Sequence, residues 1–439
     1  MNFLMDDVRK LYKKFLLASM GSALVMSVYS FVDTIAVGQS EGDMGAAAFA
    51  VITPLYGVLV FLAILCGIGG SVLMSNAKGE GNEEKGNAYF TVSVLLMLGL
   101  TAISWISLAL FHKQIFTFFG ASEAIIPKVM EYAEWIIMFF PVFIIPTFIG
   151  AFIRNDGAPT LAMVAVIVGG CINMFGDWFL VFPLRMGMKG AAIATVLGTS
   201  VQCLIMGIHF LRRKCNLRLV KPYNILHGIR KILVVGFGSS VLELGTVIIA
   251  IMMNNQIKRY GGMVELAVYG VVASVSALFQ ALFGGIGQAI QPLVSANYGA
   301  KNNDRIKQFW KMSLTTSIML GIFFTGIGEI FPIQIVRLFV NATPEMISAA
   351  PTIIRLYYII YLFLGITILA TYYLQSLMCD KLSLLIAVLR SAIINSLFIF
   401  LFPIFLGIKG IWIGLPCSEL FVAVIALCII FRINRQLDK

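Results

Sequence analysis

The chain is a succession of long apolar blocks separated by short polar segments. Each block is about 18–25 residues long, enough for an α-helix rising about 1.5 Å per residue to cross a hydrocarbon layer of about 30 Å. We therefore predict an all-α membrane protein with twelve spans, at residues 15–38, 45–74, 88–111, 130–153, 160–182, 190–211, 232–256, 267–294, 312–330, 351–378, 383–403 and 410–431.

Composition agrees with this interpretation and excludes a soluble protein. Apolar residues make up 59% of the 439 residues and charged residues only 12%, whereas soluble domains carry about 25% charged residues. A soluble protein of this length would need more charged residues than this chain has to cover its surface. The net charge of +11 comes from basic residues at the ends of the apolar blocks. We interpret these residues as setting the orientation of the chain in the membrane, and we expect no nucleic-acid partner.

The basic residues also predict an orientation. With twelve spans, 22 of the 32 Lys and Arg residues fall on the side of the N-terminus and nine on the other, while Arg390 lies within a span. Positive charge accumulates on the cytoplasmic side of membrane proteins, so we expect both termini in the cytoplasm of a multi-pass protein of the cell inner membrane. The run from Phe15 to Gly38 is longer than the apolar region of a signal peptide and is kept as the first span.

The two halves of the chain resemble each other at a shift of about 220 residues. Gly187-Met-Lys-Gly190 matches Gly407-Ile-Lys-Gly410, and Phe111–Phe119 matches Phe331–Phe339. Since each half has an even number of spans, both halves enter the membrane from the same side. We predict two pseudo-symmetric six-helix bundles, at residues 1–211 and 232–439, joined by a basic cytoplasmic linker at 212–231. Such repeats are typical of secondary transporters, which place the substrate path between the halves.

Ionisable residues inside the spans are the candidate functional residues, because a charge in the bilayer costs several kcal/mol unless it faces a cavity or a partner. Asp33 and Asp177 fall near the same ends of the first and fifth spans. Asn173 shares a helix face with Asp177, and Thr195 of the sixth span falls at the same level. Two close carboxylates suit proton exchange, and the same oxygens suit Na⁺. The alternative is a set of interfacial carboxylates that meet headgroups and water.

The second half does not repeat these residues. At the shift of 220, Asp33 corresponds to Met253, Asp177 to Leu397 and Thr195 to Leu415, so we expect an ion site in the first half only. Glu243, halfway along the seventh span, is a candidate ligand for the substrate or for a second cation. For Glu419 of the twelfth span we favour a structural ion pair with Arg390 of the eleventh.

Cofactor chemistry finds no support in the sequence. The seven cysteines mostly lie in apolar blocks without a CxxC spacing, and the three histidines are scattered. No GxxxxGK[ST] loop for nucleotide phosphates is present. We expect no enzymatic activity, no cofactor and no metal beyond Na⁺ at the four candidate residues.

Several segments resemble the multidrug and toxic compound extrusion (MATE) family of antiporters. The resemblance covers nearly the whole chain, and it is carried by Val32–Gly38, Arg154–Pro159, Asn173 with Asp177, Gly187–Gly190 and the doubled six-helix plan. It is strongest with the bacterial branch that uses an aspartate pair in the first lobe. It implies efflux of organic, often cationic drugs in exchange for H⁺ or Na⁺, with Asp33, Asn173, Asp177 and Thr195 as the cation-coupling site. Another branch pairs a glutamate like Glu243 with an aspartate that this chain lacks.

Other functions remain open at this point. A flippase for lipid-linked oligosaccharides, from the same wider superfamily, would be expected to use cationic residues for anionic headgroups, and Arg390 is the basic residue lying well within a span. A membrane enzyme would need clustered catalytic groups, and a channel or receptor would leave the repeat unexplained. We expect a monomer that acts on small organic substrates.

Overall fold

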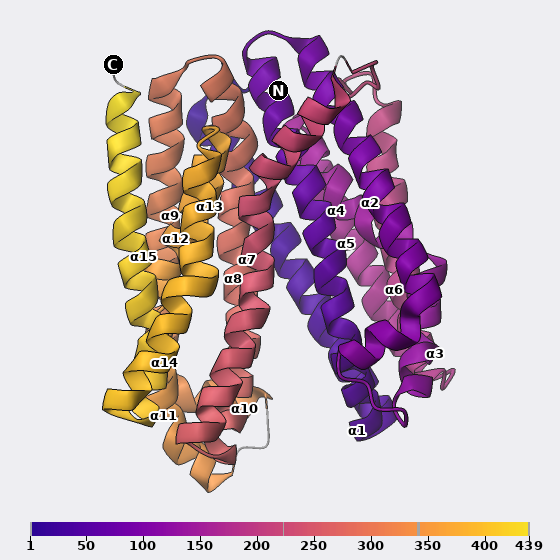
Figure 1. The fold of residues 1–439 in the computed structure, drawn as a ribbon, viewed down its shortest axis with the longest axis vertical. Coiled ribbons are helices and arrows are strands. Elements are labelled where there is room, and N and C mark those ends of the chain that lie inside the picture. Colours follow the sequence, from indigo (N-terminus) through magenta and orange to yellow (C-terminus); the bar gives the residue numbers. More distant parts are fainter. Residues whose placement is uncertain (1, 223, 340–342, 438–439) are drawn as a thin grey trace. The chain divides into compact units, whose positions relative to one another are not determined.

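A computed structural model describes residues 2–222, 224–339 and 343–437, and within these ranges the chain is helical, without β-strands (Figure 1). The elements, in order, are α1 (Val8–Gly79), α2 (Glu83–Phe118), α3 (Ile126–Met138), α4 (Phe140–Asn155), α5 (Pro159–Gly176), η1 (Asp177–Val181), α6 (Gly187–Leu211), α7 (Ile225–Tyr260), α8 (Met263–Gly299), α9 (Asn303–Ile330), α10 (Pro332–Phe339), α11 (Pro344–Tyr358), α12 (Tyr361–Ser376), α13 (Asp380–Val388), η2 (Leu389–Ile393), α14 (Ile394–Leu406) and α15 (Ile408–Gln436).

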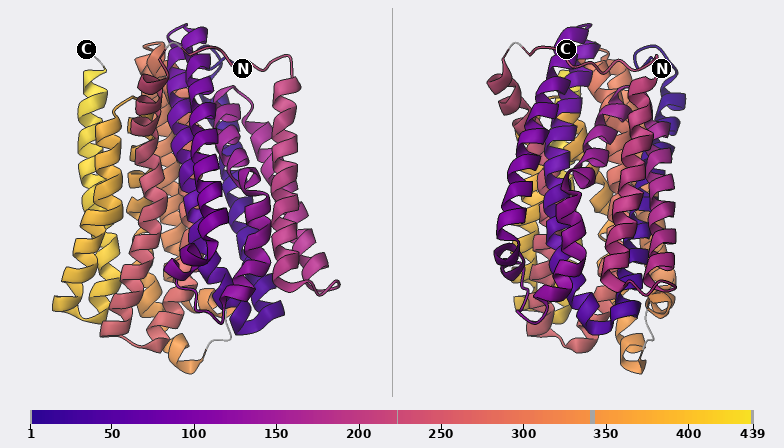
Figure 2. Two further views of the ribbon diagram at one scale, coloured as in Figure 1. Left: turned by 45° about the vertical axis from the view of Figure 1, so that its right-hand side comes forward. Right: turned by 90° about the vertical axis from the view of Figure 1, so that its right-hand side faces the viewer.

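The predicted membrane fold is confirmed. Over the described residues, eleven helices are long and apolar enough to cross a bilayer, and there are twelve when the bent pair α3 and α4 counts as one span. That pair is bent by 59° at Phe139. Each predicted span falls on one of these helices or on the bent pair. Within each half of the chain, the long helices run roughly along a common direction (Figure 2).

Two glycines shape the ends of spans in the first half. Gly42 interrupts α1 with a φ of 60°, which divides the helix into the first two spans, Val8–Gly42 and Ala47–Gly79. Gly187 begins α6 with a φ of 53°, and a Cβ there would collide with the carboxylate of Glu41. Its repeat partner, Gly407, has a φ of 58° before α15. The same left-handed turn therefore starts the last span of each half, where glycine adopts it without steric cost.

The described chain folds as two compact units. Unit 1 comprises residues 1–6 and 17–240, and unit 2 comprises residues 7–16 and 241–439. The first turns of α1 thus belong to unit 2, and the first half of α7 belongs to unit 1. The division into lobes at the 212–231 linker stays a prediction.

Close helix packing in unit 1 depends on residues without side chains. A Cβ on Gly236 of α7 would collide with the backbone oxygen of Leu65 in α1, and a Cβ on Gly69 would collide with that of Ile232. A Cβ on Gly198 of α6 would lie 2.8 Å from the Cβ of Asn173 in α5. Small residues allow such close approach in membrane proteins, where dispersion contacts must replace the hydrophobic effect. The α5–α6 contact brings Asn173 next to α6.

Candidate cation site in the first half

Four of the residues predicted from sequence lie together in unit 1. The amide of Asn173 in α5 donates to the hydroxyl of Thr195 in α6 at 3.3 Å. Asp177, four residues after Asn173, is the first residue of η1, and its carboxylate interacts electrostatically with that of Asp33 in α1. Asp33 is 6% exposed and Asp177 is fully buried. The alternative of two interfacial carboxylates meeting water therefore does not describe their surroundings.

Tyr132 of α3 joins these residues, and sequence reasoning missed it. Its hydroxyl lies 3.1 Å from the Thr195 hydroxyl and donates to Asp33 Oδ2 at 3.4 Å. The hydroxyl of Tyr56 lies 3.0 Å from that of Tyr132. Tyr132 lies between Glu131 and Glu134, which are exposed. Its burial could not be predicted from the apolar pattern, because this span is bent between α3 and α4 and does not follow a single helical periodicity. We call Asp33, Tyr132, Asn173, Asp177 and Thr195 the first-half cluster.

Several oxygen atoms of this cluster are buried without a hydrogen-bond donor. They are Asp33 Oδ1, Asn173 Oδ1 and both carboxylate oxygens of Asp177. Leaving a buried acceptor unpaired costs about 1–3 kcal/mol, and more for a charged group. None of the five cluster members is basic, so the two carboxylates have no counter-ion among them. Such a set of oxygens is suited to binding a hard cation or a proton, either of which would satisfy the acceptors and remove charge repulsion.

The other predicted residues lie in unit 2. Arg390 of η2 and Glu419 of α15 are 4% and 1% exposed, and the Arg390 Nε lies 2.9 Å from Glu419 Oε1, so the predicted pair is confirmed. Glu243 of α7 is exposed, and it interacts electrostatically with Arg390. Its role as a ligand stays a prediction.

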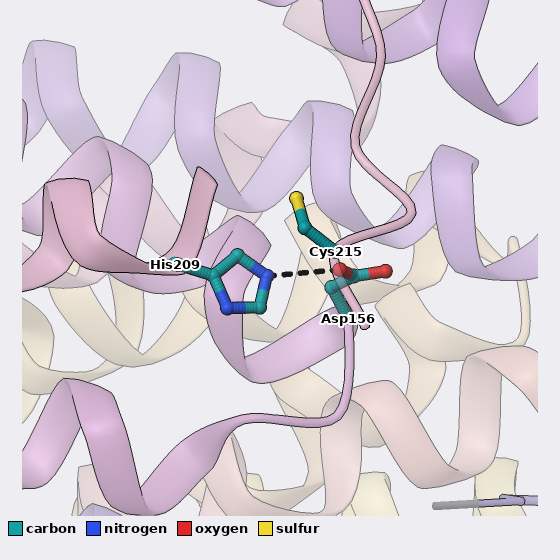
Figure 3. Close-up of side chains that lie close together, drawn as sticks. All are labelled: Asp156, His209 and Cys215. Carbon is teal, nitrogen blue, oxygen red and sulfur yellow. Dashed lines mark hydrogen bonds and ion pairs between the residues drawn. The ribbon is translucent and has the colours of Figure 1, made fainter. Parts of the chain in front are cut away.

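A second group of polar residues lies at the end of unit 1 where α4 and α6 end (Figure 3). Asp156 Oδ2 accepts hydrogen bonds from His209 Nε2 and from the backbone amide of Asn216, both at 2.9 Å. Lys78 Nζ lies 3.4 Å from Asp156 Oδ1 and donates to the Asn216 carbonyl at 3.3 Å. These contacts fasten the segment after α6 onto the ends of α1 and α4, and we call the four residues the linker clamp.

Cys215 brings a third metal-ligand type to the same place, since potential ligand atoms of Asp156, His209 and Cys215 all lie within 4.8 Å of one another. This group could not be predicted from the sequence, because Asp156 lies far from the other two residues in the chain and Cys215 lies in a segment without periodicity. Zn²⁺ commonly takes such ligands. Here the Lys78 ammonium already compensates the Asp156 carboxylate, which favours a structural clamp over a metal site.

The clamp changes the acidity of Asp156. Burial alone would raise the pKa of this carboxyl group, but the hydrogen bonds from His209 and the Asn216 amide, together with the Lys78 charge, hold the pKa below its ordinary value. A carboxyl group whose pKa is lowered in the folded state stabilises the fold above its unfolded pKa. That stabilisation is lost as the pH falls through the folded pKa.

Asp156→Asn is therefore expected to lower stability at pH 7 by about 1.5–3 kcal/mol, the range for hydrogen bonds to charged groups. The difference from the unchanged protein should shrink below about pH 4, where the unfolded carboxyl group takes up its proton. Apparent melting temperatures of the purified protein from pH 7 to pH 3 would measure this, with the exposed Glu84→Gln as control. A difference that stays constant with pH would contradict the assignment of the stabilisation to the Asp156 charge.

Comparison with known proteins decides the family. The sequence model of the MatE family matches the chain twice, at residues 18–179 and 237–401. The chain belongs to the MatE family. The paired match also supports the internal repeat, because its two parts are offset by 219 residues at their starts and 222 at their ends.

Relatives of this MatE protein agree over nearly its full length. It is 22% identical over 438 residues to the multidrug export protein MepA of Staphylococcus haemolyticus and 24% identical over 440 residues to MepA of Staphylococcus aureus, matches that cover 98% of this chain and 95% of each relative. Among solved structures, it matches the outward-facing conformation of a multidrug resistance MATE family transporter with a TM-score of 0.91 at 21% identity, covering 100% of this chain and 98% of the other. A transporter of the MOP superfamily from Pyrococcus furiosus matches with a TM-score of 0.90 at 21% identity, with the same coverage. The protein is thus a multi-pass membrane protein with the fold of a transporter.

Proposed function

We propose that this MatE-family protein is a secondary antiporter that exports organic, often cationic compounds in exchange for H⁺ or Na⁺, with the entering cation bound by Asp33, Asn173, Asp177 and Thr195. The observation that carries the proposal is the set of buried, unpaired oxygens on Asp33, Asn173 and Asp177. The names of the MepA relatives, which are multidrug export proteins, support drug efflux as the reaction.

In this proposal the cation acts by changing the relative stability of two conformations. A ligand shifts a conformational equilibrium only by its difference in affinity for the two states. Without a cation, two uncompensated carboxylates lie buried close to each other. A bound cation removes that cost, so the conformation that keeps the cluster closed around it gains stability. Tyr132 would hold Asp33 in place through its hydroxyl and contact Thr195 at the same time.

The proposal includes an orientation and a simple assembly. Both termini would lie in the cytoplasm, so the linker clamp would face the cytoplasm and the turn at Gly42 the outside. The protein would work as a monomer without a cofactor, and H⁺ or Na⁺ would be its coupling ion. Charge placement along the sequence supports this orientation.

The test is transport by the purified protein in lipid vesicles, with Na⁺ and pH gradients imposed separately. We expect uptake or release of a cationic dye to follow one of the two gradients, which would name the coupling ion. Vesicles with Asp33→Asn should show no such dependence. Dye transport that ignores both gradients would refute the antiport mechanism.

Flipping of lipid-linked oligosaccharides gains no support from the site. An anionic headgroup would need an available basic side chain, but Arg390 is 4% exposed and paired with Glu419. We therefore do not propose this activity.

A further inference from the structure

Unit 2 contains a buried polar cluster of its own around Glu419. Besides Arg390, Thr367 of α12 donates its hydroxyl to Glu419 Oε2 at 2.7 Å, and the Asn395 amide of α14 lies 3.4 Å from Glu419 Oε1. The Ser418 hydroxyl donates to Asn395 Oδ1 at 2.6 Å. All five residues are at most 4% exposed. We call Thr367, Arg390, Asn395, Ser418 and Glu419 the second-half cluster.

This cluster lies at the place in the second half that corresponds to the cation site of the first half. At the offset of 222 with which the family match ends, Asn395 is the counterpart of Asn173. Asn173 is hydrogen-bonded to Thr195 of α6, and Asn395 is hydrogen-bonded to Ser418 of α15, the helix that corresponds to α6. At the offset of 220 between Gly187 and Gly407, Glu419 corresponds to Thr199, one helical turn after Thr195. Each half thus has an asparagine hydrogen-bonded to a hydroxyl group across the corresponding pair of helices. The carboxylate comes from η1, after α5, in the first half and from α15 in the second.

The two clusters differ in charge. The first-half cluster has two carboxylates and no basic member, and several of its oxygens are unpaired. In the second-half cluster a guanidinium is bound directly to the carboxylate, and both Glu419 oxygens have donors. The repeat therefore places a fixed positive charge next to a carboxylate in one half, where the other half leaves its carboxylates without one.

We propose that Arg390 is a built-in cation: its guanidinium occupies, in the second-half cluster, the place that the coupling ion takes in the first, and its removal uncovers a site for a small cation. The inference rests on the proposed function for the role of the first-half cluster. It explains why a duplicated protein would couple to an ion through one half only. Because Arg390 neutralises Glu419 directly, the second half would need no ion from solution.

The ligands for a cation would be present once the guanidinium is gone. Glu419 would offer two oxygens, and Thr367, Asn395 and Ser418 one each, all of them hard donors suited to Na⁺. Protonation of Glu419 would satisfy the same site by removing its charge. A merely structural ion pair predicts something different, namely that losing either partner is equally damaging and that ions in solution help neither variant.

The experiment uses the full chain with the first-half site silenced by Asp33→Asn and Asp177→Asn. In this background Arg390→Met leaves the Glu419 carboxylate without its bonded counter-charge, while Glu419→Gln leaves the Arg390 guanidinium without its bonded carboxylate. Glu243 and Tyr357 also interact electrostatically with this pair, and they are unchanged in every variant. The apparent melting temperature of each purified protein would be measured against NaCl, with choline chloride at equal ionic strength as the salt control, and against pH. Arg390→Met combined with Glu419→Gln serves as the matched control that carries neither charge.

We expect Arg390→Met to lower the melting temperature, and Na⁺ or a falling pH to restore it. The parent, Glu419→Gln and the double variant should not show this rescue. If Arg390→Met responds to Na⁺ and pH no more than the double variant does, the inference is wrong. If none of the Arg390→Met protein can be purified without added cation but it can be with Na⁺ or at low pH, that also supports the inference. Since the assay measures no transport, its failure is distinct from a failure of the vesicle experiment.

Discussion

Replacing Asp33 or Asp177 by Asn is expected to abolish cation-coupled efflux while the protein still folds and reaches the membrane. Either change removes one of the two buried carboxylates that would bind the cation under the proposed function, and the amide keeps the size of the side chain. Since a cation can shift the conformational equilibrium only through differential binding, the driving gradient would no longer act on the protein. Coupling free energies of about 1–3 kcal/mol correspond to about 5–150-fold differences in affinity. Losing them should reduce efflux to the level seen without a gradient.

This first prediction is measured by dye export from cells that express equal amounts of each variant, checked on the membrane fraction. Glu134→Gln is the matched control, because Glu134 is an exposed carboxylate on α3, close in sequence to Tyr132. The control should export like the unchanged protein. Normal export by both aspartate variants would mean that the cluster does not couple ion entry to efflux.

Replacing Glu419 by Gln is expected to cause the largest loss of stability among single changes in unit 2. It removes the carboxylate that is bonded directly to the buried Arg390 guanidinium, and breaking a buried ion pair in this way typically costs about 3–5 kcal/mol. For a unit of about 200 residues this corresponds to a drop in melting temperature of about 6–20 °C. Thr367 and Asn395 would keep a polar partner in the glutamine, so the loss would report the charge pair itself.

A double-mutant cycle separates the pair from the volume of its side chains. The change Arg390→Met with Glu419→Gln removes both charges, and it should recover most of the stability, because neutral replacements of buried ion pairs are often tolerated. Apparent melting temperatures of the four proteins in detergent give the interaction energy. If the losses of the two single variants simply add in the double variant, Arg390 and Glu419 do not act as a pair.

Much of the candidate chemistry could be read from the sequence because the membrane restricts where charges occur. Four charged residues are candidates because they interrupt apolar blocks: Asp33, Asp177, Arg390 and Glu419. The pairing of Arg390 with Glu419 was predicted from their positions in the last two spans. Consecutive spans joined by a short loop are usually neighbours, which limits the partners available to a buried charge.

Other features could not be read in this way. Tyr132 looks like an ordinary residue at the start of a span, and its contact with Thr195 joins α3 to α6, two helices whose packing the apolar pattern does not specify. The linker clamp joins Lys78, Asp156 and His209, which lie at or just after the ends of α1, α4 and α6, and no periodicity specifies the relative rotation of these helices. The division of the chain at Leu16 and Ser240 into compact units likewise depends on which helices pack together.

The sequence by itself determined the helical spans, the doubled plan and the positions of the intramembrane charges. A bilayer accepts only segments that satisfy their own backbone hydrogen bonds, and a charge within it is costly unless it faces a cavity or a partner. Only the tertiary structure decided which oxygens of the first half lie together without donors and that Thr367 and Asn395 join Arg390 at the Glu419 carboxylate. The reason is that hydrogen bonds form over about 3 Å, and a separation that small depends on helix rotation, bends and glycine contacts that the apolar pattern does not record.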